Sequence, residues 1–176
     1  AELNLESMDP SVSFVDAKTG DLIGQLRLSG DLHQLSIRHM AFDAQGSVWF
    51  GCQFRGPDSQ RPQLVGYATR DGDIRLIELP PDTLGNLRNY IGSLAASRDG
   101  SLIAVSSPEG NTILAIDAAS ASLVATTVLD DGCGIAPDGP GFLASSGQGS
   151  LVGVAGSTVP QRVLGFSFDN HLRRLG

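Results

Sequence analysis

The side chains best suited to chemistry in this sequence lie in short polar stretches between apolar runs. Several carry guanidinium groups, which hold a carboxylate or a phosphate through paired hydrogen bonds. The candidate ligand-binding residues are His33, Arg38, His39, Gln53, Arg55, Arg88, Tyr90, Ser107 and Asp131. The same stretches also contain Asp58, Asn89, Glu109, Asp130 and Cys133. Together these residues predict a polar pocket suited to an anion or to a metal ion.

A structural role for the same residues is the alternative. Arg38 and Arg88 would then pair with Asp130 or Asp131 where neighbouring structural units meet. His39 would be a hydrogen-bonded residue of the core. Convergence of Arg38 and Arg88 on one pocket would favour the anion site.

The sequence matches none of the common catalytic motifs. His33 and His39 are not spaced like a helical or zinc-finger metal pair, so no metal ligand set is predicted. Ser107 and Ser145 lack the GxSxG elbow of hydrolases, and the glycines between Gly132 and Gly141 do not form GxGxxG before a helix. Catalytic residues and cofactors therefore remain unknown.

Charge and hydropathy argue against nucleic-acid binding and against a membrane span. The net charge is −7, and the 12 basic residues form no run. Nucleic-acid binding needs a basic surface that displaces counterions, so we expect no nucleic-acid partner. We expect no membrane span either, because no apolar stretch approaches about 18 residues.

A repeated pattern specifies the architecture. Residues 38–51, 92–107 and 133–146 each show a short apolar strand, a turn rich in Asp and Gly, and a second apolar strand. Hairpin patterns over residues 64–79, 112–127 and 163–175 follow them, and one more, over 11–26, opens the chain. Four-stranded units at a period of about 40 to 55 residues are typical of β-propeller blades, whose strands are lettered a to d.

We therefore predict an all-β chain, a β-propeller fragment of about three and a half four-stranded antiparallel blades, as one partial domain over residues 1–176. Its c-d hairpin spans residues 11–28, and the blades span approximately 37–79, 91–129 and 133–175. A β-sandwich also has short strands, but it has no reason to repeat itself. Trp49 is expected in the core between blades.

Loop lengths indicate where a site lies. The a-b and c-d turns are short, whereas the d-to-a and b-to-c connections are long and polar. In a propeller the second set emerges on one face, and binding residues favour elaborated loops on a rigid scaffold. All nine candidate residues lie in or beside these loops.

An incomplete ring predicts association. Propellers close with four to eight blades, so we expect this fragment to form a homo-oligomer or to receive the missing N-terminal half of the propeller. Each open side should expose a flat face rich in Val, Leu, Ile and Phe. We expect Cys52 and Cys133, which are two blades apart, to be free, largely buried thiols.

The motifs resemble one bacterial family, catalogued as domain of unknown function 1513. They are HQLSIRH at 33–39, GCQFRG at 51–56, LRNYIGS at 87–93, SSPEG at 106–110 and DGCGIA at 131–136, followed by GFL at 141–143. The resemblance implies a propeller of the amine-dehydrogenase-like, YVTN-repeat type, of which this is the C-terminal half. It also implies a periplasmic location, because family members often carry an export signal. Glu109 stands where many relatives have Arg, which weakens any anion-binding role of that loop.

Two functions follow as hypotheses. The first is a periplasmic binding or interaction module for a protein partner or a small ligand, linked by the family resemblance to iron uptake or redox handling. The alternative is a quinoprotein- or lactonase-like enzyme with a metal or cofactor at the channel mouth. The sequence offers only His33, His39, Asp130 and Asp131 for that chemistry.

Overall fold

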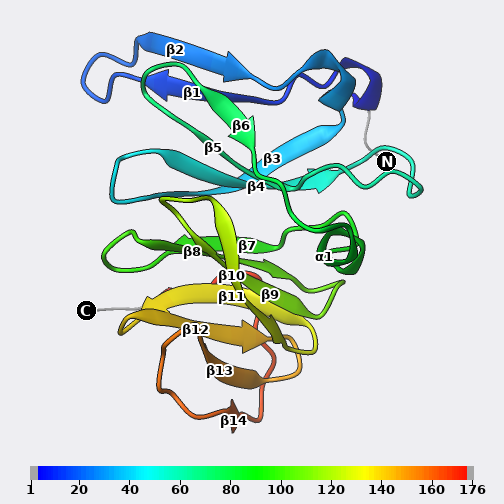
Figure 1. Ribbon diagram of the computed structural model, residues 1–176, viewed down its shortest axis with the longest axis vertical. Helices are drawn as coiled ribbons and strands as arrows, with labels where there is room; N and C mark the ends of the chain where they lie inside the picture. The colour runs from blue at the N-terminus through cyan, green and yellow to red at the C-terminus, as the bar shows by residue number, and fades with distance from the viewer. Residues whose placement is uncertain (1–3, 174–176) are drawn as a thin grey trace.

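The computed structural model describes residues 4–173. Their β-strands form four antiparallel sheets, stacked along the long axis of the molecule (Figure 1). We call the sheets blades 1 to 4 in chain order. Blade 1 consists of β1 (Ser11–Val15) and β2 (Leu22–Arg27). Blade 2 consists of β3 (Leu35–Phe42), β4 (Val48–Phe54), β5 (Val65–Ala68) and β6 (Ile74–Leu76).

The other two blades also have four strands. Blade 3 consists of β7 (Ser93–Ala96), β8 (Leu102–Ser107), β9 (Thr112–Asp117) and β10 (Ser122–Val128). Blade 4 consists of β11 (Gly132–Asp138), β12 (Gly141–Ser146), β13 (Ser150–Val154) and β14 (Arg162–Val163). Three short helices lie in the connections: η1 (Leu5–Ser7), η2 (Gly30–Leu32) and α1 (Pro81–Asn86).

The strand order confirms the predicted β-propeller architecture. Strands follow one another in chain order within every blade, and the first strands β3, β7 and β11 are neighbours in space. In a propeller these a strands line the central channel. A β-sandwich would not place three equivalent strands side by side in this way.

Strand alternation builds the core between blades. In β8, Ile103 and Val105 belong to the apolar cluster shared with blade 2, whereas Ala104 belongs to the cluster shared with blade 4. Successive side chains of a strand point to opposite faces, so one strand serves two interfaces. As predicted, Trp49 lies in the core, in the first cluster at 1% exposure. Its ring lies 5.1 Å from that of Tyr67.

Asp43 fixes the first a-b turn. Its Oδ1 accepts hydrogen bonds from the backbone amides of Gln45 (2.9 Å) and Ser47 (2.8 Å). Its Oδ2 accepts one from Trp49 Nε1 (2.9 Å), which satisfies the polar atom of a buried ring. The turn thus depends on a carboxylate that bonds its own backbone.

The predicted c-d hairpin of the last blade is wrong. Residues 163–175 were expected to form it, but the c and d strands are β13 and β14, which begin at Ser150. The hydroxyl of Ser146 accepts hydrogen bonds from the amides of Gln148 and Ser150 (both 3.2 Å), so a very short turn starts β13 at once. Leu175, the expected end of the blade, lies outside the described residues.

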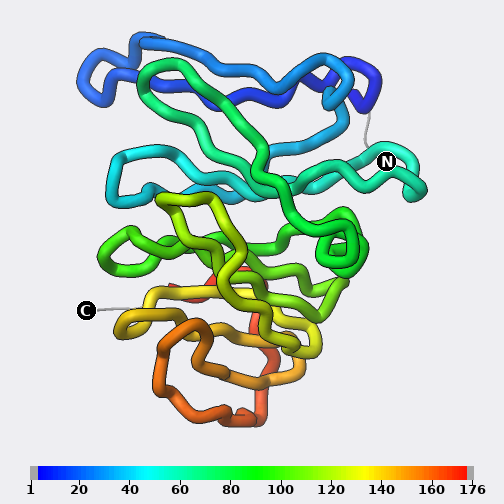
Figure 2. The backbone as a smooth tube through the Cα atoms, viewed as in Figure 1, coloured from blue at the N-terminus to red at the C-terminus, as the bar shows by residue number. Residues whose placement is uncertain are grey.

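The chain after β14 packs instead against the first strand of its own blade, as Figure 2 shows. We call residues 164–173 the C-terminal tail. The amide of Phe168 donates to the carbonyl of Ser146 (3.4 Å), and Leu172 lies against Gly134. A Cβ at Gly134 would lie 2.8 Å from the Leu172 nitrogen, so the absent side chain makes room for the tail.

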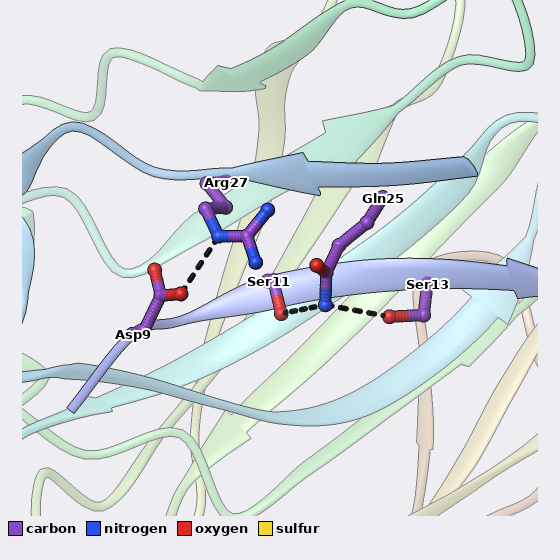
Figure 3. A network of polar contacts seen from close by, with 5 residues as sticks. All are labelled: Asp9, Ser11, Ser13, Gln25 and Arg27. Carbon is purple, nitrogen blue, oxygen red and sulfur yellow. Dashed lines mark hydrogen bonds and ion pairs between the residues drawn. The ribbon is translucent and has the colours of Figure 1, made fainter. Parts of the chain in front are cut away.

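The outer face of blade 1 matches the prediction of an apolar open side only in part, since Val15 and Leu22 are 54% and 62% exposed. The rest of this face carries polar side chains that are bonded to one another (Figure 3). Gln25 Nε2 donates to the hydroxyls of Ser11 (3.1 Å) and Ser13 (3.0 Å), and Arg27 pairs with Asp9 at 2.7 Å. Only the inner face, with Val12 at 5% exposure, joins the core. This hairpin therefore has an apolar inner face and an outer face that is polar along the network and apolar at the Val15–Leu22 pair.

Both cysteines are free and buried, as predicted. Burial raises the pKa of the Cys52 thiol to about 12. Cys133 lies in the last blade at 3% exposure.

Candidate functional site

The d-to-a and b-to-c connections gather at one end of the blades, which we call the loop end; it includes α1, at the right of Figure 1. It consists of the d-to-a segments 28–34, 77–92 and 129–131 and the b-to-c segments 55–64, 108–111 and 147–149. The predicted contrast in length holds for segments 28–34, 55–64 and 77–92 only, because the a-b turns 43–47 and 97–101 at the opposite end are longer than segments 108–111, 129–131 and 147–149. One c-d loop, residues 155–161, is longer than expected.

Hydrogen bonds join the loops of this end in pairs. The amide of Arg55 donates to the carbonyl of Gln34 (2.9 Å), and Asn89 Nδ2 donates to the carbonyl of Gln60 (3.0 Å). The amide of Asp131 donates to Oδ1 of Asn111 (2.8 Å). Each b-to-c loop named here is therefore held by a neighbouring d-to-a segment, which makes the loop end a defined surface.

Two of the predicted arginines share a hollow of about 170 Å³. It is lined by Asn4, Met8, Ser36, Arg38 and Arg55. Arg38 occupies a bulge in β3, because Ile37 pairs with Cys52 and His39 with Gly51. The bulge makes Arg38 an extra residue in the strand, and bulges re-aim side chains beside functional sites.

Gln53 links this hollow to the next blade. It is buried at 7% exposure, its Nε2 donates to the carbonyl of Ile91 (3.3 Å), and its Oε1 accepts from Arg55 Nη2 (3.2 Å). The carbonyl of Ile91 fixes which end of the amide is the donor. Gln53 also forms an isolated bridge with Tyr90, so Tyr90 is placed by backbone pairing.

Arg88 is not part of the hollow. It follows α1 with a φ of 53°, and its side chain is exposed. The ion pairs found among residues 4–173 are Arg27–Asp9 and Arg75–Asp73. Within that range, therefore, neither Arg38 nor Arg88 pairs with Asp130 or Asp131; Arg38 lines the hollow together with Arg55.

Ser107 and Asp131 hold the loops together. The hydroxyl of Ser107 is buried, donates to the carbonyl of Leu87 (2.7 Å) and accepts from the amide of Gly110 (3.2 Å). Asp131 adopts a φ of 49°, and its carbonyl accepts from the amide of Gly147 (3.0 Å). Both residues connect backbone segments of the loop end.

The two predicted histidines lie in different surroundings. His33 caps η2, with its Nδ1 3.2 Å from the carbonyl oxygen of Gly30. His39 is half-buried on β3, and its ring lies 5.8 Å from that of His171 in the C-terminal tail. Burial lowers the pKa of His39, and the nearby His171 and Arg38 lower it further.

Sequence reasoning missed His171, because residues 163–175 were assigned to a hairpin. It also missed Asn89 as a buried amide: its Oδ1 has no hydrogen-bond partner among the described atoms, while its Nδ2 bonds Gln60. No sequence pattern marks this amide: the φ of 59°, a conformation that Asn tolerates, is shown by the structure and not by the sequence.

The described part of the chain holds no group of three or more His, Cys, Asp or Glu side chains arranged to bind a metal ion. Within the same part, none of the helices is long and apolar enough to span a membrane.

Comparison with known protein families gives one match. A family model described as "Protein of unknown function (DUF1513)" matches residues 1–175. No curated protein sequence matches the chain significantly.

Solved structures with the same fold include a streptogramin B lyase, with a TM-score of 0.63, 15% identity, and coverage of 84% of this chain and 46% of that one. A catalytically inactive virginiamycin B lyase from Staphylococcus aureus, crystallised with quinupristin, has a TM-score of 0.58 and 14% identity, covering 89% and 46%. The hydrazine synthase of Kuenenia stuttgartiensis has a TM-score of 0.60 and 21% identity, covering 88% and 43%. The chain thus spans less than half the length of each of these propeller-like proteins, and at such identities the likeness shows the fold alone.

Proposed function

The chain belongs to the DUF1513 family of proteins of unknown function, and on that premise we propose that it is a binding module whose loop end takes a carboxylate or phosphate group between Arg38 and Arg55. The observation that carries this proposal is the hollow that these two side chains line together with Ser36. The anionic group belongs either to a small ligand or to a partner protein.

Two guanidinium groups beside one hollow supply the right donors. Each presents a planar fork of N–H groups that matches two oxygens of a carboxylate or phosphate. Ser36 adds a hydroxyl that can donate a third hydrogen bond. The hollow thus has two positively charged side chains in its lining, on a protein whose net charge is −7.

The hydrogen bonds that hold the Arg55 side chain favour a role in binding a ligand. Its guanidinium bonds the buried Gln53, whose other end bonds the carbonyl of Ile91, in the segment that leads to the next blade. Side chains held by such contacts lose less conformational entropy when a ligand binds.

The volume of the hollow limits the size of the anionic group that it can bind. Liquid water occupies about 30 Å³ per molecule, so a hollow of about 170 Å³ has room for several water-sized groups. That volume suits a carboxylate or phosphate with a short stem.

Binding titrations test the proposal. We expect citrate and inorganic phosphate to bind at low salt, and Arg38→Gln and Arg55→Gln each to weaken binding by about 10-fold or more, because a hydrogen bond to a charged group contributes about 1.5–3 kcal/mol. Arg98→Gln, an exposed arginine in an a-b turn at the opposite end, is the matched control and should bind as the parent does. If all three variants bind with equal affinity, Arg38 and Arg55 do not form the anion site.

Turnover distinguishes the enzyme alternative. Hydrolysis of an aromatic lactone, or dye-linked oxidation of an amine after addition of a quinone cofactor, would favour catalysis if the parent turns over and the Arg38 variant does not. The binding module predicts saturable binding without turnover.

The periplasmic location and the link to iron uptake or redox handling rest on the family resemblance. Fractionation of cells that express the full-length protein tests the first. Its abundance under iron limitation tests the second.

A further inference from the structure

Blade 1 leaves one edge of a strand unpaired. In blades 2 to 4 the third strand pairs on both sides, with the second strand and with the fourth. The corresponding strand of blade 1 is β1, and among residues 4–173 it pairs only with β2.

The backbone groups on that free edge can be identified. The amide of Leu28 donates to the carbonyl of Pro10 (3.1 Å), so residues 10 and 28 form a hydrogen-bonded pair. Hydrogen-bonded and non-hydrogen-bonded pairs alternate along antiparallel strands. Val12 and Leu26 are therefore a hydrogen-bonded pair between β1 and β2. Ser11 and Ser13 belong to non-hydrogen-bonded pairs, so their backbone N–H and C=O groups point to the free edge.

Beside this edge, β3 exposes two large apolar side chains. Met40 is 58% exposed and Phe42 is 66% exposed. Leu94 and Ile135, which face the preceding blade from β7 and β11, are 8% and 3% exposed. The a strand of blade 2 thus lacks the cover that the a strands of the next two blades have.

Strand alternation shows that Met40 and Phe42 face blade 1. Trp49 lines a hollow with Ala118 and Ala119 of blade 3, so its neighbours Val48 and Phe50 point the other way. Phe42 pairs with Val48 and Met40 with Phe50, and paired residues share a face. The hairpin β1–β2 covers the outer part of this face, where Val12 joins the core, and leaves the inner part open.

We infer that the space bounded by the free edge of β1 and by Met40 and Phe42 binds an antiparallel pair of strands from polypeptide outside this sequence. The outer strand of the pair bonds Ser11 and Ser13 of β1. The inner strand lies toward the channel and covers Met40 and Phe42. The pair completes blade 1 with the same order as blades 2 to 4.

A second copy of the chain does not fit this space. Each a-b pair of that copy is already bonded to its own c strand: β4 to β5, β8 to β9 and β12 to β13. The outer face of blade 1, moreover, carries the polar network of Figure 3, and its exposed apolar residues Val15 and Leu22 lie beyond that network. The open strand position is a different feature, because it lies laterally, beside the edge of β1.

The test supplies the strand pair from the chain's own repeat. A second copy of residues 91–107, which form β7, its turn and β8, is joined ahead of Ala1 of the full chain. Residues 1–10 then connect its second strand to β1, as the 55–64 loop connects β4 to β5. Met40 and Met8 are the two methionines of the protein, so mass spectrometry after mild peroxide treatment reads the exposure of Met40 directly.

We expect the extended chain to oxidise Met40 about 10-fold more slowly than the parent, and to protect the amides of Ser11 and Ser13 from hydrogen exchange. An extension of equal length made of Gly and Ser is the control and should leave both rates unchanged. Ser13→Pro removes an edge N–H without removing a β1–β2 hydrogen bond, so it should abolish both effects in the extended chain while the parent with this change still unfolds cooperatively.

Equal oxidation and exchange in the two extended chains would overturn the inference. So would protection of Met40 in the parent that grows with protein concentration, because that result would assign the edge to a second copy.

Discussion

Ser107 gives the sharpest test of the difference between a binding residue and a structural one. Its position in a polar loop predicts a ligand contact, but the structure buries it completely between the helix α1 and the 108–111 loop. Substitution by alanine removes a single oxygen atom and creates no steric conflict.

The magnitude follows from what the lost hydroxyl leaves behind. The carbonyl of Leu87 keeps a hydrogen bond from the amide of Tyr90 (3.0 Å), and the amide of Gly110 keeps one to the carbonyl of Ser107 (3.1 Å). Neither partner becomes wholly unsatisfied, so the cost stays near that of one net hydrogen bond, about 1 kcal/mol, and below the roughly 3 kcal/mol of an orphaned buried group.

Chemical denaturation measures this directly. We expect Ser107→Ala to lower the free energy of unfolding by about 1 kcal/mol, or the melting temperature by about 2–4 °C for a chain of this size, with an unchanged m-value. Ser59→Ala, an exposed serine in the 55–64 loop, should change neither by more than about 0.5 kcal/mol.

Affinity for phosphate completes the test. Ser107→Ala should bind it as the parent does, because the hydroxyl is sealed from solvent. Unchanged stability together with weakened phosphate binding would refute this reasoning and return Ser107 to the ligand site.

Three further predictions test the packing and the titrating groups. Gly110→Ala should destabilise the protein by about 3–5 kcal/mol, since the new Cβ would fall on the carbonyl oxygen of Asn86; thermal unfolding of soluble protein measures it, and a change below about 1 kcal/mol would contradict the contact. Because the pKa of His39 is lowered in the folded state, the unfolded state binds more protons, and stability should fall as the pH drops through the ordinary value of 6.5; urea unfolding from about pH 8 to pH 5 should show a shallower fall for His39→Gln, and an identical slope would contradict it. Native protein at about pH 8 should resist thiol alkylation, because burial raises the pKa of Cys52 to about 12 and Cys133 is also buried; two alkylated thiols should appear only after unfolding, and rapid labelling before it would show that the blades open.

The sequence by itself determined the repeat. Period-2 alternation and Asp-Gly turns are local properties, so hairpins such as β5–β6, with its turn at Asp71 and Gly72, could be predicted residue by residue. The same reasoning located the loop end and the burial of Trp49 and both cysteines, because strand alternation already separates the face that packs from the face that does not.

Only the tertiary structure decided which polar residues meet. Arg38 lies beside Arg55 because a bulge in β3 re-aims it, and no local pattern marks an extra residue in a strand. Ser107 is buried because α1 lies over it, and the tail covers Gly134 because a glycine there leaves space. These outcomes depend on contacts between segments far apart in the chain, whose geometry is set by packing and not by local conformational preference.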